Sequence, residues 1–241
     1  MLTTEVLPLG SFLLPISWIT LWLGMFAGGK AAEKWLPPET GQKAVKWSEG
    51  FLFAALIWFI VWRWSPLLWH PLSVLDHPGN LLFVSGSEKG EWLAWAAACG
   101  FLGWFSWKRR CSFWNAVDAA AITGLVTGWG YSLLFVRLGE VTTVPWGISP
   151  PGYQETYHPI HWYTVLVLTA VFVSWWKARS HLRPGGTFRW IGVSSGVGLL
   201  IVSYFNYYPV TGIWGLAREQ WLFVAMALMG WMTGFGQVKR K

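Results

Sequence analysis

Long apolar stretches separated by short polar ones dominate the chain, and they predict an all-α protein built from membrane-length helices. Each apolar stretch is close to the roughly 20 residues that an α-helix needs to cross the hydrocarbon core of a bilayer. We therefore expect one polytopic membrane domain covering residues 1–241, with about seven transmembrane helices. The predicted spans are 8–28, 48–64, 92–107, 113–136, 161–176, 189–206 and 219–236.

One partly apolar stretch, residues 66–84, differs from these seven because Pro66, Pro71 and Pro78 interrupt it. Proline removes a backbone donor and breaks a helix interior. The pattern predicts an amphipathic interfacial or re-entrant segment between the second and third helices. The first apolar run has no basic residues before it, so we expect a spanning helix there, not a removed signal peptide. The GGK and RPGG elements indicate turns.

Lysine and arginine set the expected orientation, since loops on the cytoplasmic side carry an excess of them. The two sets of predicted loops hold fourteen and four basic residues, which places the amino terminus outside, the carboxyl terminus inside and residues 137–163 on the outer face. The first set is Lys30, Lys34, Lys43, Lys46, Lys108, Arg109, Arg110, Lys177, Arg179, Arg183, Arg189, Lys239, Arg240 and Lys241; the second is Arg63, Lys89, Arg137 and Arg218.

Composition agrees with a membrane protein. Only 12% of residues are charged and 54% are hydrophobic, whereas soluble domains carry about 25% charged residues. Contact between the basic inner loops and anionic lipid explains the net charge of +7, so no nucleic-acid partner is expected. The 22 tryptophans indicate interfacial anchoring, with a stacking site for a pigment or quinone as the alternative. The anchors we expect include Trp62, Trp64, Trp69, Trp107, Trp175 and Trp176.

Candidate chemistry concentrates in residues 137–163, a polar, proline-rich segment between two apolar helices. If the preceding helix continues, Arg137 and Glu140 share a face and can pair. Arg137 is alternatively a phosphate ligand, because a guanidinium binds phosphate bidentately. His158 is a candidate general base, and His161 lies three residues further on. Hydrogen bonding to backbone at the helix start is the structural alternative for both histidines.

No metal or cofactor is predicted, because nothing in the sequence fixes a ligand geometry around the histidines, with Glu155 or His70 as further donors. Asp118 is an acidic residue inside a predicted span and should have a partner, with Asn115 or the basic residues 108–110 as candidates. Cys99 and Cys111 lack CxxC spacing and are expected not to form a disulfide.

Several short motifs occur in an order that resembles the prolipoprotein diacylglyceryl transferase family. They are TTVPWG at residues 142–147, His158-Pro159 followed by Tyr163, Phe113-Trp114 with Asp118, HPLSVLDHPGNLLFVSG at residues 70–86, and Pro184-Gly185-Gly186. The resemblance implies a seven-span protein of the bacterial cytoplasmic (inner) membrane. It also implies transfer of diacylglyceryl from a phosphatidylglycerol-like phospholipid to a cysteine of a lipoprotein precursor. His158, Arg137 and Glu140 would be catalytic, and Thr143, Trp146, Tyr163 and His161 would bind substrate.

The charged positions of the family are not kept, since they fall on Gly90, Ser132, Leu199 and Ser203. Transfer needs a base for the thiol and a cation for the departing phosphate, so we expect phospholipid binding with inefficient transfer or none. The alternatives are a non-catalytic membrane scaffold or binding subunit that contacts another membrane protein and, from a third class, a thiol-redox membrane protein.

Overall fold

The structure is a computed structural model that describes residues 6–9, 12–36, 44–69, 86–208 and 212–233. The described part is a helical bundle, which confirms the all-α fold class, with two short two-stranded hairpins. Each predicted apolar segment corresponds to one long helix. The helices are α1 (Ile16–Trp35), α2 (Trp47–Trp64), α3 (Pro66–Trp69), α5 (Glu88–Lys108), α6 (Phe113–Leu134), α7 (Ile160–Ala178), α8 (Gly186–Ser203) and α9 (Arg218–Met232).

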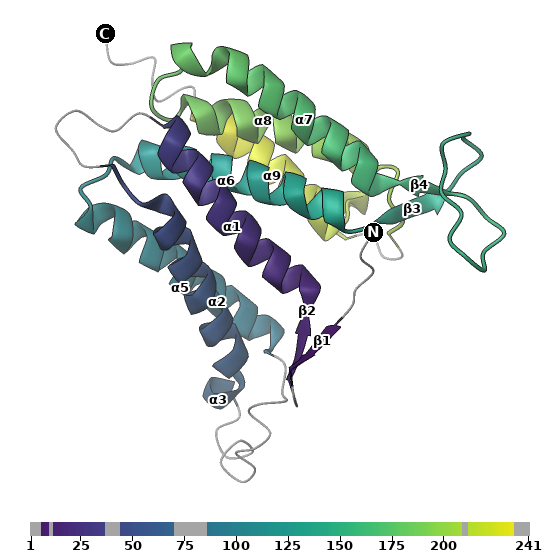
Figure 1. Ribbon diagram of the computed structural model, residues 1–241, viewed down its shortest axis with the longest axis horizontal. Coiled ribbons are helices and arrows are strands. Elements are labelled where there is room, and N and C mark those ends of the chain that lie inside the picture. The colour runs from purple at the N-terminus through teal and green to yellow at the C-terminus, as the bar shows by residue number, and fades with distance from the viewer. Residues whose placement is uncertain (1–5, 10–11, 37–43, 70–85, 209–211, 234–241) are drawn as a thin grey trace.

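The long helices run back and forth, so that consecutive helices point in opposite directions (Figure 1). Helices α1 and α6 pack against each other at the centre of the bundle. Helices α2 and α5 form a pair beside α1, and α7, α8 and α9 cover the other side of α6. The buried core follows these contacts, and its largest members are Trp47, Phe51, Phe105, Ile122, Leu125, Leu168, Trp175 and Ile191.

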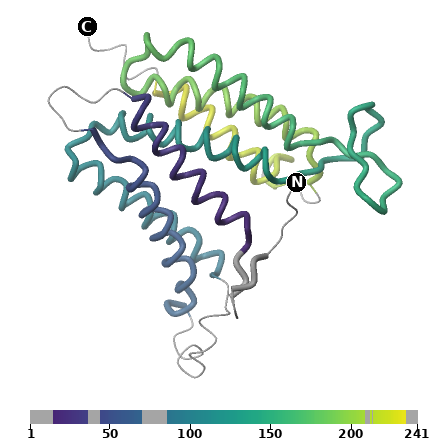
Figure 2. Tube along the Cα trace, viewed as in Figure 1, coloured from purple at the N-terminus to yellow at the C-terminus, as the bar shows by residue number. Residues whose placement is uncertain are grey.

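Positive charge is distributed unequally between the two ends of this bundle. The carboxyl ends of α1, α5 and α7 lie at the same end as the amino ends of α2, α6 and α8 (Figure 2). Most of the described basic residues lie there: Lys30, Lys34, Lys46, Lys108, Arg109, Arg110, Lys177, Arg179, Arg183 and Arg189. Arg63, Lys89, Arg137 and Arg218 lie toward the other end. The structure thus groups the basic residues into the two sets that the alternation of loops predicts.

Two helical stretches in the described residues are long and apolar enough to cross a membrane, namely Trp47–Trp69 and Gly186–Ser203. The other long helices are of similar length, between 15 and 22 residues. Tryptophan lowers the mean hydropathy of a helix although its ring is favourably placed at a membrane interface. Helix α5, for example, contains Trp92, Trp95, Trp104 and Trp107.

The start of the chain differs from the predicted helix at residue 8. Strands β1 (Val6–Leu9) and β2 (Phe12–Pro15) pair as an antiparallel hairpin, and α1 begins only at Ile16. Pro15 has the extended conformation of an N-cap residue, and Pro8 cannot donate a helical hydrogen bond. Of the segment predicted at 66–84, only α3 belongs to the described residues; residues 70–84 lie outside them.

Two further sequence interpretations are wrong. The GGK element is not a turn, because Gly28 and Gly29 lie inside α1 and let two neighbouring backbones approach closely. A Cβ on Gly28 would lie 2.7 Å from the Cα of Thr123, and a Cβ on Gly29 would lie 2.5 Å from the Cα of Ser48. Trp175 is not an interfacial anchor: its side chain is buried in the core and its indole donates to the Thr187 hydroxyl over 3.3 Å.

A buried carboxylate holds α8 against α6. The two oxygens of Asp118 accept hydrogen bonds from the backbone amides of Gly185 and Phe188, each 2.7 Å long. These amides belong to the first turn of α8, where backbone donors have no helical partner. The RPGG turn forms this N-terminus, with Gly185 in the left-handed region at φ 84°. Asp118 was expected to have a partner, with Asn115 or the basic residues 108–110 as candidates. The partner that the structure shows is a helix N-terminus, which the sequence did not indicate.

Glu33 acts in the same way between α1 and α2. Its carboxylate accepts from the backbone amide and from the hydroxyl of Ser48, at 2.9 and 2.6 Å, and from the Lys30 ammonium. Ser48 lies in the first turn of α2 and is fully buried. Each of these carboxylates complements the positive end of a helix dipole.

Candidate functional site

The segment predicted to carry the chemistry projects from the end of the bundle as a hairpin (Figure 1). Strands β3 (Leu138–Val141) and β4 (Tyr157–Pro159) pair antiparallel, and α7 begins directly after β4. The hairpin is fixed to the bundle at Gly139, where a Cβ would lie 2.1 Å from the carbonyl oxygen of Phe205. The backbone amide of Glu140 donates to that same oxygen over 2.9 Å. The end of α8 and the hairpin therefore form one surface.

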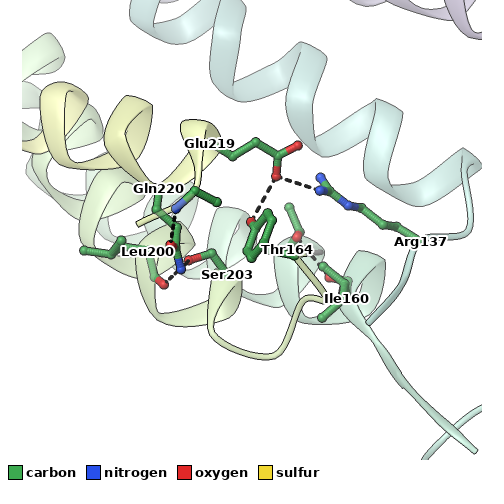
Figure 3. Close-up of polar contacts among 9 residues, drawn as sticks. Arg137, Ile160, Thr164, Leu200, Ser203, Glu219 and Gln220 are labelled. Carbon is green, nitrogen blue, oxygen red and sulfur yellow. Dashed lines mark hydrogen bonds and ion pairs between the residues drawn. The ribbon is translucent and has the colours of Figure 1, made fainter. Parts of the chain in front are cut away.

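Arg137 and Glu140 do not share a helix face, because α6 ends at Leu134 and Glu140 lies in β3. The expected helical pairing of these two residues is wrong. Instead, Nη2 of Arg137 contacts the carboxylate of Glu219 in α9 at 2.6 Å (Figure 3). The Tyr208 hydroxyl donates to the same Glu219 oxygen over 3.1 Å. About half of the Arg137 side chain remains exposed to solvent.

Tyr208 completes this cluster as a neutral donor. Burial raises the pKa of the phenol above its usual value, and the Glu219 carboxylate acts in the same direction. The hydroxyl therefore keeps its proton at neutral pH and donates it to Glu219. We call Arg137, Tyr208 and Glu219 the ion-pair cluster.

A second set of polar groups lies on the hairpin side. The indole Nε1 of Trp146 donates to the Tyr163 hydroxyl over 2.8 Å, and that hydroxyl lies 3.1 Å from Nδ1 of His158. An indole nitrogen can only donate, so the Tyr163 oxygen accepts from it. The direction of the second bond, between this hydroxyl and Nδ1 of His158, is set by the tautomer of the imidazole. We call these three residues the aromatic relay.

Phe205 connects the two sets. Its ring centroid lies 5.1 Å from that of His158 and 5.7 Å from that of Tyr163. Phe205 and Tyr208 belong to the same short segment after α8. The ion-pair cluster and the aromatic relay therefore flank one turn of backbone.

The remaining predicted site residues lie elsewhere. His161 is 3% exposed, and its Nδ1 lies 3.0 Å from the backbone oxygen of Arg137. It joins the start of α7 to the segment before β3, which is the backbone-bonded alternative considered for it. Thr143 and Glu140 are exposed on the hairpin. The structure thus brings together His158, Tyr163 and Trp146, and separately places Arg137 with a residue that the sequence did not indicate.

Two of the positions that the sequence resemblance aligned with charged residues, Gly90 and Ser203, have packing and hydrogen-bonding roles. The Ser203 hydroxyl accepts from the Gln220 side chain over 3.2 Å and donates to the Leu200 carbonyl over 2.6 Å (Figure 3). Gln220 in turn accepts from the backbone amide of Ala217 and so caps α9. A Cβ on Gly90 would lie 1.9 Å from the Ser65 hydroxyl, so this glycine serves the packing of α5 on α2. Ser203 and Gly90 therefore hold the helices together and supply no cation or base.

Sequence reasoning missed Glu219, Tyr208 and Phe205. Glu219 follows Arg218 at the start of the last apolar segment, where an acidic residue is ordinary helix-end chemistry. Its contact with Arg137 joins residues 82 positions apart. No local spacing indicates such a contact.

The described residues offer little for metal binding or for thiol chemistry. Within them, no three histidine, cysteine, aspartate or glutamate side chains come close enough to hold a metal ion. His70 lies outside the described residues. Cys99 is an exposed thiol within α5, and Cys111 is a partly exposed thiol in the turn after it; neither is part of a disulfide.

No protein-family model matches the chain, and no curated protein matches it.

Proposed function

We propose that this chain is a seven-span protein of the bacterial inner membrane with its amino terminus outside. The back-and-forth course of the long helices and the concentration of basic residues at one end support this topology. At about 1.5 Å per residue, helices of 18 to 22 residues measure about 27–33 Å, close to the thickness of a bilayer core. The hairpin and the ion-pair cluster then face outward.

At this outer end the protein binds the headgroup of an anionic phospholipid and does not transfer the diacylglyceryl group. The half-exposed guanidinium of Arg137 carries this proposal. In the tautomer in which Nδ1 accepts from the Tyr163 hydroxyl, His158 adds a ring N–H donor at Nε2. A donor suits a phosphate oxygen, whereas activation of a thiol requires a base.

Arg137 supplies the charge for headgroup binding. Its contact with Glu219 uses one guanidinium N–H, and a guanidinium has five. The exposed remainder can bind a phosphate oxygen. Glu219 weakens this attraction, because it neutralises the guanidinium within 2.6 Å. Such an arrangement favours reversible binding over stabilisation of a departing phosphate.

Titration of the purified protein with short-chain phosphatidylglycerol, and with phosphatidylcholine of the same acyl length, tests the proposal by calorimetry. We expect a preference for phosphatidylglycerol that Arg137→Ala weakens by about tenfold or more, the value of one hydrogen bond to a charged group. Glu219→Gln should strengthen binding, because it removes a negative charge and keeps an acceptor. Arg218→Ala is the matched control, since Arg218 lies at the same end and pairs with Glu88 at 2.7 Å.

Equal affinity for both lipids in the unmodified chain, or no effect of Arg137→Ala, would contradict headgroup binding. The absence of transfer is tested separately, by expression in a bacterial strain depleted of its own diacylglyceryl transferase. We expect no rescue of growth. Robust rescue would show that the chain is an enzyme.

A second candidate function is that of a non-catalytic scaffold in a larger membrane complex. The exposure of Val141, Trp146 and Tyr153 on the projecting hairpin supports it, with 55%, 61% and 64% of their surfaces accessible. Aromatic residues of this kind are enriched in protein interfaces. Replacing Tyr153 and Val141 by serine should release a defined partner from the gently solubilised complex on native gels. Trp107→Ser, at the opposite end of the bundle, is the control.

A further inference from the structure

A cavity of about 650 Å³ lies between α1, α2, α5 and α6, away from the hairpin and the ion-pair cluster. Its volume falls within the range of about 300–1,000 Å³ that is usual for small-molecule sites. No charged residue lines it. The cavity therefore favours an uncharged, largely apolar ligand.

One wall of the cavity is aromatic. Trp18 and Trp22 from α1, Phe51 and Trp58 from α2, and Trp95 from α5 contribute to it. The rings contact one another, with centroids 5.8 Å apart between Trp18 and Trp58 and 5.7 Å apart between Trp58 and Trp95. The planes of these rings are tilted against one another by 54° and 57°, so the wall presents both ring faces and ring edges.

The opposite wall is one face of α6 and consists of small residues, namely Ala120, Thr123, Gly124, Thr127 and Gly128. A Cβ on Gly124 would meet no atom within 4 Å. This glycine is thus not required for helix packing, unlike Gly28, and a side chain there would enter the cavity. A wall of small residues beside aromatic side chains leaves room for a planar ring, which can stack on an indole.

Unused polar groups occur in both walls. The Nε1 of Trp58 and the hydroxyls of Thr123 and Thr127 are buried and have no hydrogen-bond partner in the part of the chain that the structure describes. Helical threonines commonly donate to the carbonyl four residues earlier, as Thr164 and Thr169 of α7 do at 2.9 and 2.7 Å. Two threonine rotamers are accessible in a helix, so rotation can direct either hydroxyl into the cavity.

We propose that this cavity binds an uncharged, lipid-soluble ring compound that carries carbonyl oxygens, the chemistry of an isoprenoid quinone. The ring stacks on the indoles and lies against the Gly124 face of α6. Its carbonyl oxygens accept hydrogen bonds from the threonine hydroxyls. This site is separate from the headgroup site and does not depend on it.

Calorimetric titration of the intact protein in detergent with 2,3-dimethoxy-5-methyl-6-decyl-1,4-benzoquinone tests the proposal, with decanol as the ring-free probe. We expect saturable binding of the quinone and none of decanol. Gly124→Leu fills the cavity and should abolish binding, whereas Gly130→Leu should leave it unchanged. Gly130 is the matched control, because it lies on the same helix, has no atom within 4 Å of its Cβ and does not line the cavity.

Thr123→Val and Thr127→Val remove one hydroxyl each and keep the shape, and the double variant should weaken binding by about tenfold. Thermal unfolding of each variant shows whether it is folded. Unchanged binding in folded Gly124→Leu would overturn the location of the site. Equal binding of decanol would overturn the ring chemistry and indicate an acyl-chain site. No binding of either probe by the unmodified protein would overturn the proposal altogether.

Discussion

The contact between Asp118 and the first turn of α8 allows a quantitative prediction about stability. Asp118→Ala removes a 2%-exposed carboxylate and leaves the amides of Gly185 and Phe188 without their acceptor. Each hydrogen bond to a charged group contributes about 1.5–3 kcal/mol. The two bonds together predict a loss of about 3–6 kcal/mol in the free energy of unfolding.

Asp118→Asn separates the contributions. Its amide keeps one oxygen acceptor but turns an NH₂ group toward the second backbone donor, so one bond is lost and the attraction of the charge to the helix dipole disappears. We expect an intermediate loss of about 2–4 kcal/mol. Glu91→Ala is the control, since it removes an exposed carboxylate from the first turn of α5.

The measurement is reversible unfolding in mixed detergent micelles, followed by tryptophan fluorescence. We expect the free energy of unfolding to be highest for the unmodified chain, lower for Asp118→Asn and lowest for Asp118→Ala. If Asp118→Ala unfolds at the same denaturant fraction as the unmodified chain, the carboxylate does not stabilise α8. If Asp118→Asn were less stable than Asp118→Ala, the two hydrogen bonds would not explain the stabilising effect of the carboxylate.

Three further predictions concern packing, capping and topology. Gly28→Ala should lower the free energy of unfolding by about 1–3 kcal/mol, because its Cβ would lie 2.7 Å from backbone atoms of Thr123. Gly103→Ala, where the Cβ would lie in open space, should leave the stability unchanged. Equal effects of the two variants would argue against close α1–α6 packing. Glu33→Ala should destabilise by about 2–4 kcal/mol through the loss of its two bonds to Ser48, and Glu49→Ala, on the exposed side of α2, is the comparison in the same thermal assay. In a chain with Cys99 and Cys111 replaced by alanine, a single cysteine at Gln154 should react with an impermeant thiol reagent in intact cells, and one at Ser180 only after lysis; equal labelling of both would exclude the proposed topology.

The helices were predictable because burial in a bilayer or a bundle requires long uninterrupted apolar runs. Each of the long helices contains most of one predicted segment. The start of α1 was misplaced because residues 8–15 are apolar, and hydropathy does not distinguish a hairpin from a helix there. Gly28 and Gly29 were misinterpreted for a related reason: two adjacent glycines favour a turn locally, whereas close contacts with α6 and α2 favour them within a helix.

The candidate site was predictable only in part. His158, Tyr163 and Trp146 were identified through short motifs, and the structure brings them together by hydrogen bonds. Arg137 was identified, but its partner was not, because Glu219 lies in the last helix and the contact depends on how α9 packs on α8. Asp118 was known to need a partner, yet backbone amides carry no signature in the sequence. The residue pattern therefore did not predict which residues contact each other across long distances in the sequence.

The two capping carboxylates also bear on the order in which the protein is made. Glu33 precedes Ser48, and Asp118 precedes Gly185, so in both pairs the acceptor is synthesised before the helix whose amides it receives. Asp118 and Gly185 are 67 positions apart, so during translation the acceptor is made well before the first of its donors. Until then the Asp118 carboxylate lacks both amide donors of α8. Once α8 has been made, its first-turn amides can bind Asp118. Helix α8 therefore packs onto α6, and α9 onto α8, after α6 has been made.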